Sequence, residues 1–527
     1  MAVYVSPSMW VRGYVPKHGL KKHQRSSVNS VARASLVSVV CLVAEVVAAA
    51  PLWVMNRSAM ASPSIPLGTG WAARISRLQV WSRRPHWSRP LRVASDCTGS
   101  GNAETSFHKL VQDLEVIFTC DHEPAVQHWM RAHMKAKYMF GDIMDRKCNV
   151  TSISGTTCEG VVVSINRGDV DVYTAGFPCT PWSGKGLRLG WLDPNAKPLL
   201  KIRKTIFALQ PPLVILENVP GVLNNGGLHV LKKFLGILKN YHIWVSHPLS
   251  PHSFGVPQHR NRIYIVMMKQ SSLKFPDMSL HHFELFLTRF LEAVSMESVE
   301  PWPDWLAAMG CPMIRDVYGS PEEEVPCPVP FCCTPEATCN VHLCKCPECK
   351  RGTLSKCKWR VSHRRYKCSV AYQSRVRAFL RVVRKVKGDK TVRAPDSYFQ
   401  QAHRARLRVG AACLSPSKRS LLHLCSQERL LMKKTVIMDI SQSLGRSALR
   451  DDGLTPTLSC GCTQMFAPYF GCSLTMQQCM TLQGMRPTDY DLECLPATDV
   501  FRLVGNAMCI PVVGSVFAAA LSLLQEE

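Results

Sequence analysis

Acidic residues are scarce in this 527-residue chain: 38 Asp and Glu stand against 64 Lys and Arg, a formal net charge of +26. A charge this large favours a polyanionic partner, most simply nucleic acid, with an anionic membrane surface second and ordinary basic solubility as the alternative. Charged residues make up only 19% of the chain and apolar residues 46%. This composition excludes disordered, coiled-coil and collagen-like classes, and the length allows two to four domains of about 150 residues.

A regular cysteine spacing is also missing, although the chain has 24 cysteines. This excludes a small disulfide scaffold. Mixed spacings fit a reducing compartment, in which thiols serve as nucleophile, metal ligand or small buried apolar group.

Residues 1–90 lack acidic side chains almost completely. Up to residue 95 there is one acid, Glu45, against thirteen Lys and Arg. The apolar run 36–55 is interrupted by Glu45 and Pro51, which weakens a membrane span. A secretory signal, an organelle transit peptide and an extension without function are the other interpretations. We expect a basic, poorly ordered or targeting extension.

Residues 91–269 alternate short apolar runs with amphipathic stretches. This pattern predicts an α/β fold with a mostly parallel sheet and helices on both faces, in which ligands bind outside the carboxyl ends of the strands. Residues 436–527 regain the same character and end in a predicted helix over 510–524. The predicted strands lie at 91–94, 114–118, 170–175, 213–216, 241–245 and 263–268.

A different composition separates these two parts, and we expect a smaller module over residues 270–435. Residues 351–450 hold 25 Lys and Arg and only four acids. Residues 321–368 of this module are rich in cysteine, and Cys344, Cys346 and Cys349 with Cys339 could bind a structural zinc ion. His342 or Cys357 could replace Cys339, and free thiols are the alternative.

Three short segments carry candidate chemistry. Cys179 follows Pro178 in a loop after a predicted strand, where a nucleophile could sit. Glu217 and Asn218 directly follow the apolar run 213–216, at the end of the predicted strand. A carboxyl group can be partly desolvated at such a place. The side chains of Gln258, Arg260 and Arg262 would share one face of an extended chain.

The order of these segments resembles the signature motifs of the C5-cytosine-specific DNA methyltransferases. The matching stretches are Phe177-Pro-Cys-Thr-Pro-Trp-Ser, Glu217-Asn-Val, Gln258-x-Arg-x-Arg and, near the C-terminus, Gly505-Asn-Ala. The resemblance covers residues 91–269 and 436–527 and makes 270–435 the target-recognition module. It implies a DNA (cytosine-5-)-methyltransferase with a Rossmann-like fold that uses S-adenosyl-L-methionine.

The resemblance also implies which residues bind the cofactor. The loop with Gly99 and Gly101 resembles the first cofactor motif, in which glycine permits a close turn. Asp121 takes the place of the acid that holds the ribose, with His122 near the adenine. Asp142 would face the adenine amino group, and Asn506 would return to the cofactor.

In this family the nucleophile adds to C6 of a cytosine flipped out of the duplex. Cys179 would be that nucleophile and Glu217 would bridge N3 and the exocyclic amine. Arg260 would support O2, and Arg262 would lower the pKa of the Cys179 thiol. Lys185 and Arg188 would contact phosphates from a loop that closes over DNA. The resemblance adds further substrate contacts at Pro178, Ser183, Asn218 and Gln258.

The chain departs from the family pattern at five positions. Cys97 replaces a Phe of the cofactor motif, and Thr180 follows the catalytic Cys where Gln is usual. Cys472, Met476 and Gln478 replace the Arg, Pro and Glu of the penultimate motif, which organises target recognition.

Double-stranded DNA is the expected partner; no protein partner is indicated and no membrane partner is favoured. The alternatives are a tRNA-directed cytosine-5 methyltransferase and a catalytically silent nucleic-acid-binding homologue. DNA as substrate places the protein in the nucleus if the source is eukaryotic, with organelle targeting through residues 1–90 as the other location.

Overall fold

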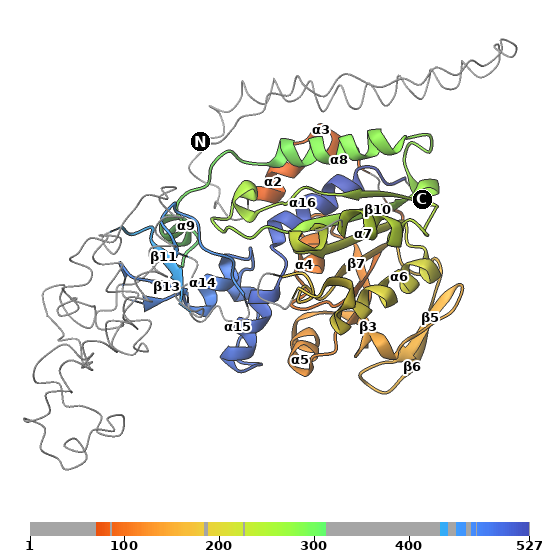
Figure 1. Ribbon diagram of the computed structural model, residues 1–527, viewed down its shortest axis with the longest axis horizontal. Helices are drawn as coiled ribbons and strands as arrows, with labels where there is room; N and C mark the ends of the chain where they lie inside the picture. Colours follow the sequence, from red (N-terminus) through yellow and green to blue (C-terminus); the bar gives the residue numbers. More distant parts are fainter. Residues whose placement is uncertain are drawn as a thin grey trace, which may run out of the picture.

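The computed structural model describes residues 70–84, 87–183, 188–224, 227–311, 433–440, 449–459, 465–470 and 472–525. A seven-stranded sheet forms its centre (Figure 1). All neighbouring strands are parallel except β10 (Ile263–Lys269), which is antiparallel to both β8 (Leu213–Asn218) and β9 (Tyr241–Val245). In spatial order the strands are β3 (Ala136–Phe140), β2 (Leu114–Cys120), β1 (Leu91–Asp96), β7 (Val172–Gly176), β8 (Leu213–Asn218), β10 (Ile263–Lys269) and β9 (Tyr241–Val245).

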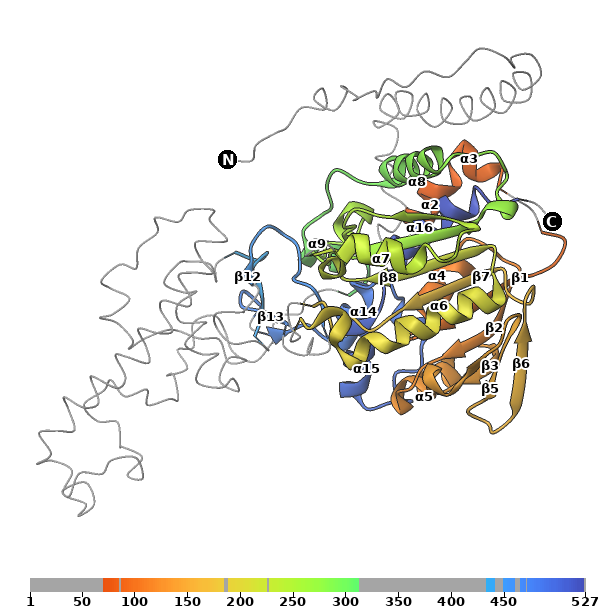
Figure 2. The ribbon, with the colours of Figure 1, turned by 45° about the vertical axis from the view of Figure 1, so that its right-hand side comes forward.

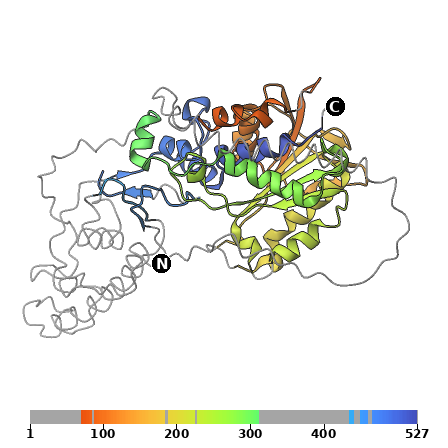
Figure 3. The same cartoon turned by 90° about the horizontal axis from the view of Figure 1, so that it is seen from above.

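Helices cover both faces of this sheet, which confirms the expected α/β class with a mostly parallel sheet. One face is covered by α6 (Lys197–Leu209) and α7 (Gly227–Leu235), and the opposite face by α4 (Asn102–His108) and α16 (Ile510–Leu521). In the view from above, the yellow-green helices lie opposite the red and blue ones (Figure 3). The remaining described helices are α2 (Gly70–Ser76), α3 (Gln79–Ser82), α5 (Pro124–His133), α8 (Leu280–Val294), α9 (Trp302–Ala308), α14 (Met476–Thr481) and α15 (Ala497–Asn506).

The six predicted apolar runs all became strands of the sheet because burial on both faces demands continuous apolar sequence. Every residue of β8 is buried, including its last two, Glu217 and Asn218. The sequence reading missed β3, whose first three residues are only partly buried or exposed. An edge strand of this kind carries a weaker apolar signal.

The predicted C-terminal helix is α16, which packs against α4, α8 and α2. Residues Ala497–Leu521 are long and apolar enough to cross a membrane by length and composition, but 89% of the most apolar window is buried inside the structure. We therefore describe α16 as the central core helix on its face of the sheet.

Residues 70–84 differ from the extension that we expected up to residue 90. Helices α2 and α3 pack onto the core, and Trp71, Ile75 and Trp81 are buried. A Cβ atom at Gly514 of α16 would lie 2.2 Å from the Trp71 ring, so the indole fits against bare helix backbone. The local sequence does not predict this packing, because Trp71 and Gly514 are more than 400 positions apart in the chain.

We expect Trp71→Ala to lower the free energy of unfolding by about 3–5 kcal/mol, the usual cost of truncating a buried aromatic side chain. Denaturant titration of the full chain measures this change. The exposed Arg77, directly after the end of α2, provides the control, since Arg77→Ala should change the stability by less than about 0.5 kcal/mol. Equal stabilities of the wild type and Trp71→Ala would contradict the packing of α2 on the core.

The core also continues past residue 269, where we expected a boundary. The apolar face of α8 is buried, and α8 packs against α16, α2 and β9. Residues 312–432 lie outside the described residues, and so do the zinc candidates Cys339, Cys344, Cys346 and Cys349. The described residues contain no group of three or more His, Cys, Asp or Glu side chains that could hold a metal.

Two small sheets accompany the main one. Figure 2 shows β12 (Leu449–Arg450) and β13 (Met465–Ala467) away from the main sheet. The segment before β11 (Ile437–Asp439) contacts α9, because the indole nitrogen of Trp302 donates to Thr435 O at 2.8 Å. One small sheet contains β12 (Leu449–Arg450), β11 (Ile437–Asp439), β13 (Met465–Ala467) and β14 (Cys472–Ser473). The other contains β4 (Lys147–Cys148), β5 (Ser152–Thr156) and β6 (Val162–Asn166).

Candidate active site

The Cys179 loop follows directly from the carboxyl end of β7. The carbonyl oxygen of Cys179 accepts hydrogen bonds from Trp182 N at 3.0 Å and Ser183 N at 2.9 Å, which close a tight turn. Asn218 Nδ2 donates to Phe177 O at 2.9 Å from the end of the neighbouring strand. These bonds fix the backbone around the thiol, and Cys179 itself remains partly exposed.

A carboxylate and a guanidinium form an ion pair beside this loop. Arg262 Nε lies 2.9 Å from Glu217 Oε1, and both side chains are largely shielded from solvent. Strand pairing positions them, because Glu217 is paired with Gly176 in β7 and Arg262 immediately precedes β10. The ion pair thus lies at the carboxyl end of β8, where parallel-sheet proteins bind their ligands.

Cys179 lies within electrostatic reach of Arg262, Glu217 and Arg260. Burial is the strongest influence and raises the pKa of the Cys179 thiol above its ordinary value; Glu217 raises it further, whereas Arg262 and Arg260 lower it. We expected a net lowering of this pKa. The structure differs because the desolvation of the thiol outweighs the two arginines.

Gly176 marks the point at which the separate motifs meet. A Cβ atom at this position would lie 2.9 Å from Met508 Cε, 3.7 Å from Glu217 Oε2 and 3.9 Å from Cys97 O. The strand end that precedes Cys179 is therefore surrounded by residues of three separate motifs. These are Cys97 at the start of the cofactor loop, Glu217 at the end of β8 and Met508 in the C-terminal segment. The sequence spacing alone could not show this convergence.

Arg260 has a different role from the one expected. Its Nη1 donates to Leu458 O at 2.6 Å and Gly505 O at 3.0 Å, and its Nη2 donates to Ala507 O at 2.8 Å. The side chain is buried, and burial lowers the pKa of Arg260 to about 10. Its hydrogen bonds hold the backbone on both sides of Asn506, so we describe Arg260 as a positioning residue.

Gln258 and Asn218, expected among the substrate contacts, are also fully buried. Gln258 Nε2 donates to Leu482 O at 2.8 Å. Asn218 Oδ1 accepts from Val219 N at 2.8 Å, in addition to the bond that its amide donates to Phe177. Both amides stabilise loop backbones instead of pointing into solvent.

The cofactor loop has the predicted glycine geometry. Gly99 and Gly101 have positive φ angles of 59° and 76°. A Cβ atom at Gly99 would meet nothing within 4 Å, whereas one at Gly101 would lie 2.6 Å from Met134 Sδ. Gly99 thus borders open space, and Gly101 permits close packing.

Asp121 lies beside this loop at the end of β2. Its Oδ2 accepts from Gly99 N and its Oδ1 from Glu123 N, both at 3.1 Å. Burial raises the pKa of Asp121, and the two backbone N–H groups oppose the rise. His122 Nδ1 lies 3.6 Å from Asp121 Oδ1, and the imidazole is largely exposed.

The other two cofactor candidates lie at the surface. Asp142 is exposed and caps a short 3-10 helix by accepting a hydrogen bond from Met144 N at 2.8 Å. Aspartate is commonly found at such N-cap positions. Asn506 is exposed at the end of α15.

Sequence reading missed two residues that hold the cofactor loop. Asn102 Nδ2 donates to Met508 O at 2.8 Å, and Asn102 Oδ1 accepts from Ser100 Oγ at 2.9 Å. Trp129 Nε1 donates to Ser100 O at 3.2 Å. An Asn directly after Gly-x-Gly was the only available signal.

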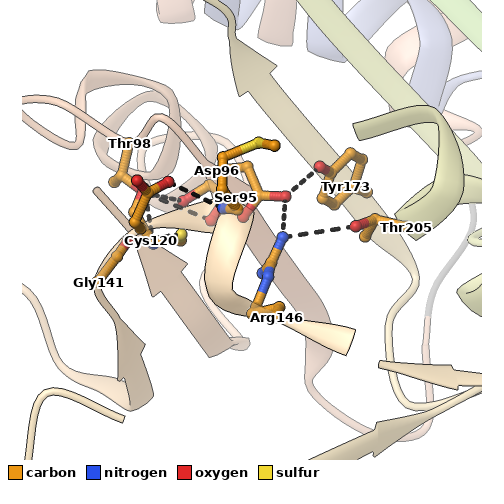
Figure 4. Close-up of polar contacts among 10 residues, drawn as sticks. Ser95, Asp96, Thr98, Cys120, Gly141, Arg146, Tyr173 and Thr205 are labelled. Carbon is orange, nitrogen blue, oxygen red and sulfur yellow. Dashed lines mark hydrogen bonds and ion pairs between the residues drawn. The ribbon is translucent and has the colours of Figure 1, made fainter. Parts of the chain in front are cut away.

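A buried charged network lies under the same strand ends (Figure 4). Arg146 Nη2 donates to Asp96 Oδ2 at 2.5 Å and to Thr205 Oγ1 at 3.4 Å, and Tyr173 also donates to Asp96. Asp96 is the last residue of β1, directly before Cys97, whose φ of 51° is positive. The network anchors the strand from which the cofactor loop begins.

Part of the predicted DNA-closing loop lies outside the described residues. Lys185 lies outside the described residues, and Arg188 is exposed with a positive φ of 57°. Ser183 is partly buried, and its N–H is bonded to Cys179 O.

Two departures in the penultimate motif have a structural explanation. Gln478 forms a capping box with Thr475: Thr475 N donates to Gln478 Oε1 at 2.8 Å and Gln478 N donates to Thr475 Oγ1 at 3.2 Å. Glutamine performs this task as well as glutamate does. Met476 is the first residue of α14, a position that a proline would also fit.

Comparisons with known proteins find similarity over part of the chain. Residues 91–299 match the family model for C-5 cytosine-specific DNA methylase. The chain is 32% identical over 133 residues to Type II methyltransferase M.BsuFI of Bacillus subtilis, covering 24% of this chain and 31% of the relative. It is 35% identical over 107 residues to Type II methyltransferase M.MspI of Moraxella sp, covering 20% and 26%.

The chain thus spans about a third or less of the length of these curated relatives. Among solved structures, the Schizosaccharomyces pombe protein titled Dnmt2 methyltransferase aligns over 82% of this chain and 98% of its own, with 13% identity and a TM-score of 0.40. By these comparisons, residues 91–299 are similar to the C-5 cytosine-specific DNA methylases.

Proposed function

We propose that this chain methylates C5 of cytosine in double-stranded DNA through a covalent bond between Cys179 and C6 of the base. The position of Cys179 within electrostatic reach of the Glu217–Arg262 ion pair carries this proposal. The similarity to DNA methyltransferases and the net charge of +26 support it.

The residues around the glycine loop fit S-adenosylmethionine. The open space beside Gly99 and the Asp121 carboxyl next to it suit a ligand with a ribose diol. When bound, this cofactor supplies the electrophilic methyl group. Asp121 and the backbone of the loop Gly99–Gly101 would orient it.

The chemistry requires a nucleophile because C5 of cytosine is unreactive towards electrophiles. The Cys179 thiolate adds to C6, and the electron pair of the C5–C6 double bond then gives C5 the character of an enamine carbon. Glu217 stabilises the ring by a hydrogen bond to N3 and accepts one from the exocyclic amine. Loss of the C5 proton and departure of Cys179 restore the aromatic ring.

Arg262 keeps the Glu217 carboxyl in place through the bond from its Nε. The target base must leave the helix stack before Cys179 can reach C6, which costs a few kcal/mol. Arg188, and Lys185 on the undescribed part of the same loop, would contact phosphates.

Bisulfite sequencing tests this proposal with the full chain, S-adenosylmethionine and two substrates, duplex DNA and tRNA. We expect protected cytosines in the DNA only. Protection in tRNA alone would favour the RNA-directed alternative, and no protection in either would favour the catalytically silent one.

A further inference from the structure

A stretch of the chain with almost no acidic residues surrounds the candidate active site. Between residues 172 and 276 there are thirteen Lys and Arg but only two acids, Asp193 and Glu217. Glu217 is paired with Arg262, and Asp193 caps a short 3-10 helix by accepting from Asn195 N at 2.9 Å. This stretch therefore offers its other cations almost no acidic partner of its own.

Helices α6 and α7 carry six of these cations and no acid. Both helices lie on the same side of the main sheet (Figure 2). Arg203 of α6 joins them, because its guanidinium lies 4.1 Å from the centre of the Phe234 ring and its Nη1 donates to Phe234 O at 3.3 Å. We call the joint surface the α6–α7 face, and its other cations are Lys197, Lys201, Lys204, Lys232 and Lys233.

Three of these lysines form a stripe along α6. Lys197, Lys201 and Lys204 have the spacing i, i+4 and i+7, which places them on one side of the helix over about 10 Å. Lys197 and Lys204 are exposed, and Lys201 is partly exposed. Within the part of the chain that the structure describes, none of the three amines has an ion-pair partner. The stripe is thus a row of unneutralised charge.

This arrangement is unfavourable for the helix itself. Lys197 is the first residue of α6, where a cation opposes the positive end of the helix dipole. Like charges four residues apart, such as Lys197 and Lys201, also repel each other. Because both effects cost stability and no local partner offsets them, an anionic ligand explains the stripe better than helix stability does.

An aromatic row connects the α6–α7 face to the nucleophile loop. Trp182, whose backbone N–H bonds to Cys179 O, lies 5.7 Å from Trp191 between ring centres, and Trp191 lies 5.5 Å from Phe234. Since α6 connects the parallel strands β7 and β8, it begins at the edge of the sheet where Cys179 lies. A polyanion bound at this edge can therefore continue along α6 over positive surface.

We propose that the α6–α7 face binds the phosphate backbone of duplex DNA that flanks the target base. Lysine amines act as point charges towards phosphates, so these contacts position the duplex without reading its sequence. Leu200 and Phe207, about half exposed on α6, would also suit an anionic membrane, but the continuity with the Cys179 loop favours DNA. The inference rests on the proposed function, because it extends the contact with the same substrate.

Steady-state methyl transfer to two duplexes tests the face. Both contain the same central cytosine, and their lengths of about 12 and 30 base pairs correspond to about 40 and 100 Å. We expect Lys197→Gln/Lys201→Gln/Lys204→Gln to raise KM for the longer duplex by at least about tenfold. It should leave KM for the shorter duplex and both kcat values within about twofold. The slope of log KM against log salt for the longer duplex should fall by about three, one for each lysine.

A second triple variant removes the same charge at the opposite edge of the sheet. Lys135→Gln/Lys137→Gln/Lys239→Gln changes three exposed lysines at or just before the first residues of β3 and β9. These strands begin at the edge away from Cys179, since both run parallel to β7. We expect this control to keep the wild-type KM for both duplexes.

The outcomes separate the α6–α7 face from the proposed function. An unchanged KM for the longer duplex, an equal rise for both lengths or an equal rise in the control would each overturn the face alone. Loss of binding to phosphatidylserine vesicles with an unchanged KM would assign the face to a membrane instead. If the wild type methylated neither duplex, the proposed function would fail, and fluorescence anisotropy with the longer duplex would then decide on the face, with an equal affinity of wild type and variant overturning it.

Discussion

A Cys179→Ser variant is expected to lose DNA methyl transfer by at least about a thousandfold, since a neutral hydroxyl is a far weaker nucleophile than a thiolate. The loss should lie in kcat, because Cys179 forms a bond with the base only during the reaction. Transfer of a labelled methyl group from S-adenosylmethionine to duplex DNA measures it.

The matched control is Cys148→Ser, which alters another partly exposed free thiol in the separate small sheet. We expect this control to retain the wild-type rate. If Cys179→Ser methylated DNA as fast as Cys148→Ser does, the covalent mechanism would be wrong even if the chain proved to be a methyltransferase.

The second large effect is expected at the carboxylate opposite the nucleophile. Glu217→Gln should lower kcat by about a hundredfold to a thousandfold, the range found when one preorganised group is removed from a transition state. The amide keeps the size of the side chain but lacks the negative charge that pairs with Arg262. It also cannot take up a proton and pass it to N3, as a carboxyl group can. Steady-state kinetics with saturating DNA separate this effect from weaker binding.

A surface ion pair provides the comparison for Glu217. Glu159 lies 3.7 Å from Arg131, and both side chains are about half exposed. Glu159→Gln removes the same charge and should leave kcat within about twofold, because exposed ion pairs contribute little. Similar losses in the two variants would show that Glu217 acts through general electrostatics and not through contact with the base.

Six strands of the main sheet were predictable because each contains a short apolar run, whereas the edge strand β3 was missed. Cys179 and Glu217 stood out in the sequence because Cys179 follows one apolar strand and Glu217 lies at the end of another. The roles of Arg260 and Gln258 were not predictable from the sequence. Both were expected to face the substrate, but their partners are backbone carbonyls about 200 or more residues further along the chain. Sequence spacing identifies polar side chains on one face and gives no information on which distant backbone reaches them.

The prediction of an extension up to residue 90 was wrong for residues 70–84, again because the contacts involve distant parts of the chain. The stretch that contains Trp71 and Trp81 is basic and interrupted by proline, so its own pattern predicts no core. Its burial depends on Gly514, whose missing side chain makes room for the Trp71 indole. Such a fit between distant residues exists only in the folded chain.

The central claim is that Cys179 bonds to C6 of a cytosine, and DNA containing 5-fluorocytosine tests it most directly. Fluorine at C5 cannot leave as a proton does, so the adduct should persist after methyl transfer. We predict a denaturation-resistant complex whose mass is that of protein, DNA and one methyl group, with the crosslinked peptide containing Cys179. A chain that methylates unmodified DNA but gives no such complex, or one that crosslinks through another residue, would contradict the account.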